Sequence, residues 1–176
     1  MKGLIEVNKK IKLLVVGDGP DLDSYKEYCS KNNISDNCIF AGKVPWDKIV
    51  SYYLVSDVFA TASHTETQGL TVIEAMAASL PVLAIRDESF TDTVVDNLNG
   101  LIFRNRKEFK NSVLSLVDDK DMLNRLSKQA RNSAEVHSSK YFAEQILNVY
   151  RITLKNKPKH KIPFFERIFK VIGGKK

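Results

Sequence analysis

The alternation of short apolar runs with helix-forming segments constrains the fold more than any other feature of this chain. A short apolar run that ends in a turn is typical of a buried strand. Such runs lie at 12–16, 38–41, 58–62, 82–85 and 101–103. The segments between them predict helices at 21–32, 47–55 and 70–78. Strands that alternate with helices in this way imply a parallel sheet with helices on both faces. We therefore predict an α/β fold with a Rossmann-like parallel sheet.

The C-terminal part of the chain is predicted to be helical only. Apolar residues recur at helical spacing over 107–117, 121–136 and 139–155. After Lys155 the composition changes to a basic, proline-containing segment with several phenylalanines. We predict a single Rossmann-like domain over 1–155, including this helical extension, and a basic amphipathic tail over 156–176.

The basic charge of the chain is concentrated in that tail. Of 27 Lys and Arg residues and 21 acidic residues, 8 basic residues and only Glu166 lie from position 155 onward. The remaining domain is nearly neutral, so a nucleic-acid-binding face is not expected. Lysines beside Phe164, Phe165 and Phe169 are typical of a helix that binds an anionic membrane surface. The alternative is a closing helix that packs on another domain.

Cysteine usage and the N-terminal segment favour a cytoplasmic location. Cys29 and Cys38 are too few for a disulfide framework and lack the spacing of a zinc site. The N-terminal residues show neither a signal peptide nor a run of about 20 apolar residues that could span a membrane. The three histidines are scattered, so no metal site is expected.

A glycine-rich turn follows the first predicted strand. Gly17-Asp18-Gly19-Pro20 has the position of a dinucleotide-binding fingerprint, but Leu22 replaces its third glycine and Pro20 lacks a backbone donor. Two interpretations remain: a tight turn that needs a positive φ, or a loop that borders a ligand.

The most informative segment runs from Ser63 to Ala77. Gly69 precedes a predicted helix, and the unpaired amides of a helix N-terminus favour a phosphate group. Glu66 lies on the loop before Gly69, and Glu74 lies about one turn into the helix. Two carboxylates beside an anion site suit a sugar nucleotide, because they accept hydrogen bonds from sugar and ribose hydroxyls. The alternative is that both glutamates are solvated or compensate the helix dipole.

The same segment resembles the Glu-x7-Glu motif of the family 4 retaining glycosyltransferases, which have the GT-B fold. Glu66, Gly69 and Glu74 are followed by Ala-Met-Ala and then by Pro-Val, as in that motif. Further landmarks match in the same order, at 16–20, 40–45 and 56–59. Within the family, the sequence around Glu66 and Trp46 is most similar to enzymes that glucosylate diacylglycerol from UDP-glucose. The resemblance implies transfer of a hexose such as glucose from a UDP-sugar to an acceptor, either a membrane lipid or a cell-envelope glycan.

The resemblance implies roles for individual residues. Glu66 is expected to be catalytic and to contact the donor sugar, and Glu74 to hold the ribose hydroxyls. The amides of Gln68, Gly69 and Leu70 are expected to bind the diphosphate, with Thr71 beside them. Gly17 and Gly19 would border the phosphates, and the Lys43–Val44 backbone would meet the base. No metal or other cofactor is expected. The departing diphosphate is thought to deprotonate the acceptor on the same face of the sugar, which retains configuration.

This chain departs from the family pattern in its length. A GT-B enzyme has two Rossmann-like domains with the active site between them, and 176 residues have room for the C-terminal, donor-binding half only. The family's Arg and Lys near its first C-domain strand have no certain counterpart, and Lys2-Gly3 is either a remnant or a coincidence. We therefore expect the isolated chain to be inactive without the missing N-terminal acceptor domain. Two alternatives remain: a fragment of a GT-B sugar-nucleotide epimerase, and a non-catalytic membrane-associated module.

Overall fold

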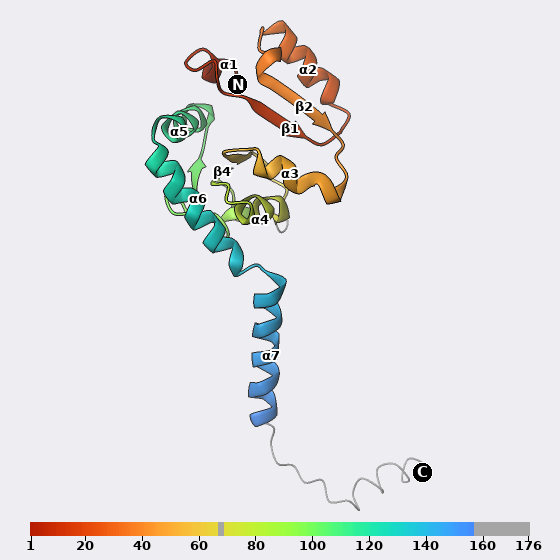
Figure 1. Ribbon diagram of the computed structural model, residues 1–176, viewed down its shortest axis with the longest axis vertical. Coiled ribbons are helices and arrows are strands. Elements are labelled where there is room, and N and C mark those ends of the chain that lie inside the picture. The colour runs from red at the N-terminus through yellow and green to blue at the C-terminus, as the bar shows by residue number, and fades with distance from the viewer. Residues whose placement is uncertain (67–68, 157–176) are drawn as a thin grey trace, which may run out of the picture. The chain divides into compact units, whose positions relative to one another are not determined.

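The computed structural model describes residues 1–66 and 69–156 (Figure 1). Strands and helices alternate up to β5 and are followed by helices only, as predicted. The helices and strands are α1 (Lys2–Ile5), β1 (Leu13–Val16), α2 (Leu22–Lys31), β2 (Cys38–Gly42), α3 (Ile49–Leu54), β3 (Phe59–Thr61), α4 (Leu70–Ala77), β4 (Val82–Ile85), β5 (Gly100–Phe103), α5 (Arg106–Asp118), α6 (Lys120–Glu135) and α7 (Ser139–Lys155). Three 3₁₀ turns are also present, η1 (Ser35–Asn37), η2 (Trp46–Lys48) and η3 (Glu88–Phe90).

The described strands pair in parallel, which confirms the predicted fold class. β1 pairs with β2, and β3, β4 and β5 form a second sheet in that order. In the second sheet Thr61 lies opposite Ala84, and Ile85 lies opposite Phe103. Because neighbouring strands run in the same direction, the segments that follow β3, β4 and β5 all leave the sheet at the same edge, where the carboxyl ends of these strands lie.

Helices cover both faces of the β3–β4–β5 sheet. Successive side chains of β4 point to opposite faces, and because all of them are apolar, each face has to be covered. Val82 and Ala84 pack with Val72 and Met76 of α4 on one face. Leu83 packs with Leu116 of α5 on the other face. α6 contributes to both clusters, through Ala130 and Ala134 on the first face and Leu126 on the second. α4 is therefore fixed to the sheet through its apolar side.

A separate small core lies beside the β1–β2 pair. Cys29 of α2, Ile34 and Cys38 of β2 are buried together, with Leu13 and Phe40 packed against them. Both cysteines are free thiols. Burial, and next the hydrogen bond and charge of the neighbouring Cys29, raise the pKa of Cys38 to about 11. Cys38 is thus a packing residue and a poor nucleophile at neutral pH.

The chain divides into two compact units, Met1–Ser138 and a second that begins at Ser139. In the second unit the structure describes α7, whose bounds agree with the predicted helix at 139–155. α7 is amphipathic, and apolar side chains such as Phe142, Val149 and Leu154 are exposed along it. The predicted tail lies outside the described residues from position 157 onward. Within the part that the structure describes, every helix is too short or too polar to cross a membrane.

Candidate functional site

The helix whose N-terminus is the predicted anion site is present as α4, and its first turn is preceded by a glycine in an unusual conformation. Gly69 is the N-cap residue of α4 and has a φ of +57°, in the left-handed region. That conformation strains residues with a β-carbon, which explains why glycine occupies the position. Gly69 is buried beside Phe90, while Leu70 and Thr71 in the first turn are exposed. The first amides of α4 therefore lie at the surface of a helix whose apolar side is fixed in the core.

Glu74 lies on the exposed side of α4, away from the core, and is held by a tyrosine from a different element. The hydroxyl of Tyr53 in α3 donates a hydrogen bond to Oε2 of Glu74, over 3.0 Å. Burial, and next this hydrogen bond and the negative charge of Glu74, raise the pKa of Tyr53. The phenol therefore stays protonated and remains a donor. Among the described residues no group donates to Oε1 of Glu74, which leaves that oxygen available to a ligand hydroxyl.

Glu66 lies in the segment that joins β3 to α4. Its side chain is half-buried, and it follows His64 and Thr65 along the chain. The next two residues, Thr67 and Gln68, lie outside the described residues, so the predicted role of the Gln68 amide stays a prediction. Because β3 ends at Thr61 and α4 begins at Leu70, the path of the chain brings Glu66 to the edge of the sheet from which α4 starts.

A hydrogen-bonded group lies at the same edge of the sheet. Nδ1 of His64, after β3, is 2.9 Å from Oδ2 of Asp87, after β4. The backbone amide and the hydroxyl of Ser89 both donate to Oδ1 of Asp87, over 3.0 and 2.6 Å. The Ser89 hydroxyl, next His64 and then the Ser89 amide lower the pKa of Asp87 to about 2. Asp87 is therefore ionised at neutral pH and accepts all three hydrogen bonds.

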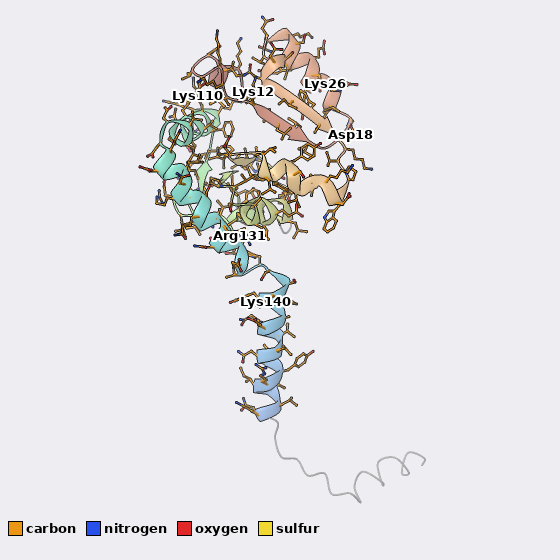
Figure 2. All side chains as sticks on the ribbon, viewed as in Figure 1. Lys12, Asp18, Lys26, Lys110, Arg131 and Lys140 are labelled. Carbon is orange, nitrogen blue, oxygen red and sulfur yellow. The ribbon has the colours of Figure 1, made fainter. Side chains whose placement is uncertain are left out.

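The turn after β1 and the loop after β2 come together around an open pocket. Gly17 has a φ of +139° and its amide donates to the carbonyl of Gly42, over 2.9 Å. Asp18, Gly19 and Lys43 line the pocket, whose volume is about 570 Å³. Figure 2 labels Asp18 at the end of the β1–β2 pair where both strands finish. The two predicted groups, Gly17 with Gly19 and Lys43 with Val44, thus lie beside each other.

Among the described residues, the predicted site residues fall into two groups: Glu66, Gly69, Leu70, Thr71 and Glu74 on α4 or the segment before it, and Gly17, Gly19, Lys43 and Val44 after β1 and β2. Tyr53 bonds to Glu74 of the first group, and its helix α3 follows the Lys43–Val44 loop along the chain. Lys2 and Gly3 lie in α1, which packs against α5. Over the described part of the chain, no group of three or more His, Cys, Asp or Glu side chains could hold a metal ion.

Sequence patterns did not identify Tyr53, His64 or Asp87 as site residues. Tyr53 fits the apolar side of its helix, so periodicity alone assigns it to packing. The available signal is chemical, since a half-buried tyrosine hydroxyl normally requires a hydrogen-bond partner. The equivalent signal at Asp87 is the Asp-x-Ser pattern, in which the carboxylate caps a short turn.

Comparison with known proteins shows the family of the chain. A family model described as "Glycosyl transferases group 1" matches residues 1–133. The chain belongs to the group 1 glycosyltransferase family. The alpha-monoglucosyldiacylglycerol synthase of Acholeplasma laidlawii is 32% identical over 139 residues, which cover 79% of this chain and 35% of that protein. The enzyme of the same name from Streptococcus pneumoniae is 32% identical over 120 residues, or 68% of this chain and 27% of that protein. The chain thus spans only between about a quarter and a third of the length of these relatives.

Solved structures match the fold of this group 1 domain. The C-terminal domain of the Francisella tularensis glycosyltransferase LpcC has a TM-score of 0.69 at 23% identity, over 77% of this chain and 73% of that one. Anabaena HepE in complex with UDP has a TM-score of 0.70 at 19% identity, over 84% of this chain and 44% of that one. At these identities the likeness concerns the fold alone. It identifies the chain as the C-terminal half of a GT-B architecture, as the sequence predicted.

Proposed function

We propose that this chain is the donor-binding domain of a retaining glycosyltransferase that transfers glucose from UDP-glucose to a diacylglycerol-type lipid. The observation that carries the proposal is Glu74, turned away from the core, held by Tyr53, and next to a helix N-terminus capped by left-handed Gly69. Two relatives are alpha-monoglucosyldiacylglycerol synthases, which supports a glycolipid product. Several solved structures with the same fold are complexes with UDP or UDP-glucose, which supports a UDP-sugar donor.

In this proposal the start of α4 binds the diphosphate. The amides of Gln68, Gly69 and Leu70 donate to its oxygens, and the helix dipole favours its negative charge. Thr71 adds a hydroxyl donor in the same turn. Glu74 accepts hydrogen bonds from the ribose through Oε1, because Oε2 is occupied by Tyr53. Gly17 and Gly19 border the phosphates, and the pocket beside Lys43 and Val44 receives the base.

Glu66 contacts the transferred sugar, so it affects the rate of transfer more than the affinity for the nucleotide. The departing diphosphate takes the acceptor proton on the face from which it leaves, so configuration is retained. The domain contributes orientation of the sugar and stabilisation of the charge that develops on the diphosphate. No metal takes part in this scheme, and an N-terminal domain of the same enzyme supplies the acceptor pocket. We further propose that the basic tail brings the enzyme to an anionic membrane at its cytoplasmic face.

Two other functions remain open to test. A GT-B sugar-nucleotide epimerase would also bind UDP-sugars, but it would release an epimerised sugar nucleotide rather than a glycolipid. A non-catalytic membrane-associated module would bind vesicles without nucleotide. Analysis of the product of the full-length protein distinguishes the epimerase from the glycosyltransferase. A nucleotide titration distinguishes the non-catalytic module from both enzymes.

The testing experiment is a calorimetric titration of the chain with UDP, GDP and ADP, followed by UDP-glucose. The proposal expects binding of UDP in preference to the other two nucleotides. Glu66→Ala is expected to weaken UDP-glucose relative to UDP and, in the full-length enzyme, to lower kcat strongly. A chain that binds none of the three nucleotides would contradict the proposal, and equal loss of UDP binding in Glu66→Ala would reassign Glu66 to the nucleotide.

A further inference from the structure

The described residues on either side of positions 67–68, in the segment that carries Glu66, both contact one short stretch of the chain, residues 87–90. At its start, His64 bonds to Asp87 through Nδ1 and Oδ2, over 2.9 Å. At its end, Gly69 packs against Phe90, whose ring carbon Cε1 lies 3.8 Å from the β-carbon position of the glycine. The bond between His64 and Asp87 spans 23 positions of sequence, so it is a tertiary contact rather than a local turn.

Residues 87–90 are themselves firmly held. Phe90 is only 1% exposed and belongs to the core cluster on the α4 face of the sheet. Asp87 caps η3 by accepting from the amide of Ser89, and the Ser89 hydroxyl makes a second bond to the same oxygen. Asp87 directly follows Arg86, whose amide donates to the carbonyl of Phe103 in β5 over 2.7 Å. Asp87, the partner of His64, is thus held between the end of β4 and the core residue Phe90.

The protonation of the pair follows from its chemistry. Asp87 is ionised at neutral pH, since its hydrogen bonds lower its pKa to about 2. An ionised carboxylate only accepts hydrogen bonds, so Nδ1 of His64 carries the hydrogen. The His64 side chain is 59% exposed, and an exposed pair of this kind contributes little to global stability. Its effect is therefore expected on the geometry of the attached segment and much less on the melting temperature.

We propose that His64 is a positioning residue, which holds Glu66 at the donor sugar by tying the start of its segment to Asp87. This inference rests on the proposed function and adds to it a residue that acts through Glu66. Without the tie, the local bond from the amide of Thr65 to the hydroxyl of Ser63 still shapes the described residues around His64, but no bond to Asp87 holds them to the sheet. Glu66 then has to be ordered when the sugar binds, which weakens sugar contacts but leaves the nucleotide contacts of α4 and the Lys43 pocket unchanged.

The test compares the affinities of the chain for UDP and for UDP-glucose, measured by calorimetry or by NMR titration. The measured quantity is the ratio of the two dissociation constants. His64→Ala is expected to shift this ratio against UDP-glucose by about tenfold, which corresponds to about 1.4 kcal/mol, with UDP affinity changed less than about twofold. His64→Asn is expected to restore most of the ratio, because its amide nitrogen can donate to Asp87 from near the Nδ1 position. His137→Ala, an exposed histidine after α6, is the matched control.

A spectroscopic measurement keeps the proposal testable if His64→Ala folds poorly. ¹⁵N NMR of the imidazoles is expected to show His64 with its hydrogen on Nδ1 when neutral, and Asp87→Ala is expected to remove that preference while leaving His137 unchanged.

The outcomes separate this inference from the proposed function. A wild-type chain that binds neither UDP nor UDP-glucose contradicts the proposed function. A ratio that moves in Glu66→Ala but not in His64→Ala overturns the inference alone. Equal weakening of UDP and UDP-glucose in His64→Ala also overturns it, since it indicates general damage. If the ratio of the dissociation constants for UDP and UDP-glucose is unchanged in both variants, Glu66 does not contact the sugar, and the positioning role of His64 is overturned as well.

Discussion

Tyr53→Phe tests the most specific contact in the candidate site. The substitution removes only the hydroxyl that donates to Oε2 of Glu74 over 3.0 Å. The ring itself remains, together with its contact to Phe59, where the ring centroids lie 6.1 Å apart at 50°. The packing of α3 is therefore retained, and any effect reports on the hydrogen bond.

The stability cost follows from the environment of the two groups. A hydrogen bond between neutral groups contributes about 0.5–1.5 kcal/mol net, and a charged acceptor raises this value when it is buried. Glu74 is exposed, so water screens its charge and we take about 1 kcal/mol. In a chain of this size a loss of about 1 kcal/mol lowers the melting temperature by about 2–4 °C.

The cost in ligand binding arises from the freedom that Glu74 regains. Ordering a released side chain on binding costs about 0.5–1.5 kcal/mol, so UDP affinity should fall by about two- to twelvefold in Tyr53→Phe. Glu74→Gln also removes the charge of the acceptor, worth about 1.5–3 kcal/mol for a hydrogen bond, so it should weaken UDP by about tenfold or more. The melting temperature of Glu74→Gln should change little.

The assay is a double-mutant cycle on UDP affinity with both single variants and their combination. Because Tyr53 acts through Glu74, the two losses should not add, and the coupling should be about 1 kcal/mol. Ultraviolet titration gives an independent signal: one tyrosine of the 6 should ionise at higher pH than the rest, and its pKa should fall in Glu74→Gln. Strictly additive losses of affinity would refute the argument that Tyr53 orients the carboxylate.

Three further predictions concern other parts of the chain. Gly69→Ala should cost about 1–2 kcal/mol of stability through backbone strain at a φ of +57°, whereas Gly19→Ala, with open space around it, should cost little in the same melting assay. The Ser89 hydroxyl, next His64 and then the Ser89 amide lower the pKa of Asp87 from 3.8 to about 2, so its stabilising effect is complete above about pH 4 and is lost as pH falls toward 2. Wild type should therefore melt above Asp87→Asn at pH 5, with a difference that shrinks below pH 4, and a constant difference would contradict this. Binding to anionic vesicles should weaken with salt and disappear when residues 157–176 are deleted, so binding that survives the deletion would reject the tail as its cause.

The sequence predicted the parts of the fold that local patterns determine. The strand at 82–85 and the helix at 139–155 have the predicted bounds, because a buried strand and an amphipathic helix each repeat their own period. Gly17 adopts a positive φ, which agrees with the tight turn proposed for the Gly17–Gly19 segment, whereas the left-handed conformation of Gly69 was not predicted. The predicted helix at 47–55 begins instead with the 3₁₀ turn Trp46–Lys48, since Pro45 fixes the backbone just before it.

The remaining features depend on which segments the fold brings together. The pairing of strands into two sheets is a tertiary outcome that apolar runs do not encode. Tyr53 and Glu74 are 21 positions apart, and His64 and Asp87 are 23 apart, so no helical or strand period relates them. Short elements such as α1 and η3 give too few repeats for a period to be seen. Sequence patterns thus nominated Glu66, Gly69 and Glu74, whose roles stay predictions, but gave no indication of Tyr53, His64 and Asp87, which contact this region in the structure.

The last prediction concerns which steps the isolated chain can carry out without a second domain. Its sheet, covering helices and core should allow it to fold alone, with the start of α4 already formed. Its donor contacts would come from one side of a cleft only, so a UDP-sugar should bind weakly, at about 0.1–1 mM or roughly −4 to −5.5 kcal/mol. Transfer should be undetectable, because the acceptor is not oriented and water is not excluded from the sugar. The assay incubates the purified chain with UDP-glucose and diacylglycerol vesicles and measures glycolipid, with a parallel UDP titration to show that the site is formed. Robust glycolipid formation would refute the two-domain argument, because orientation of the acceptor would then come from residues within this chain.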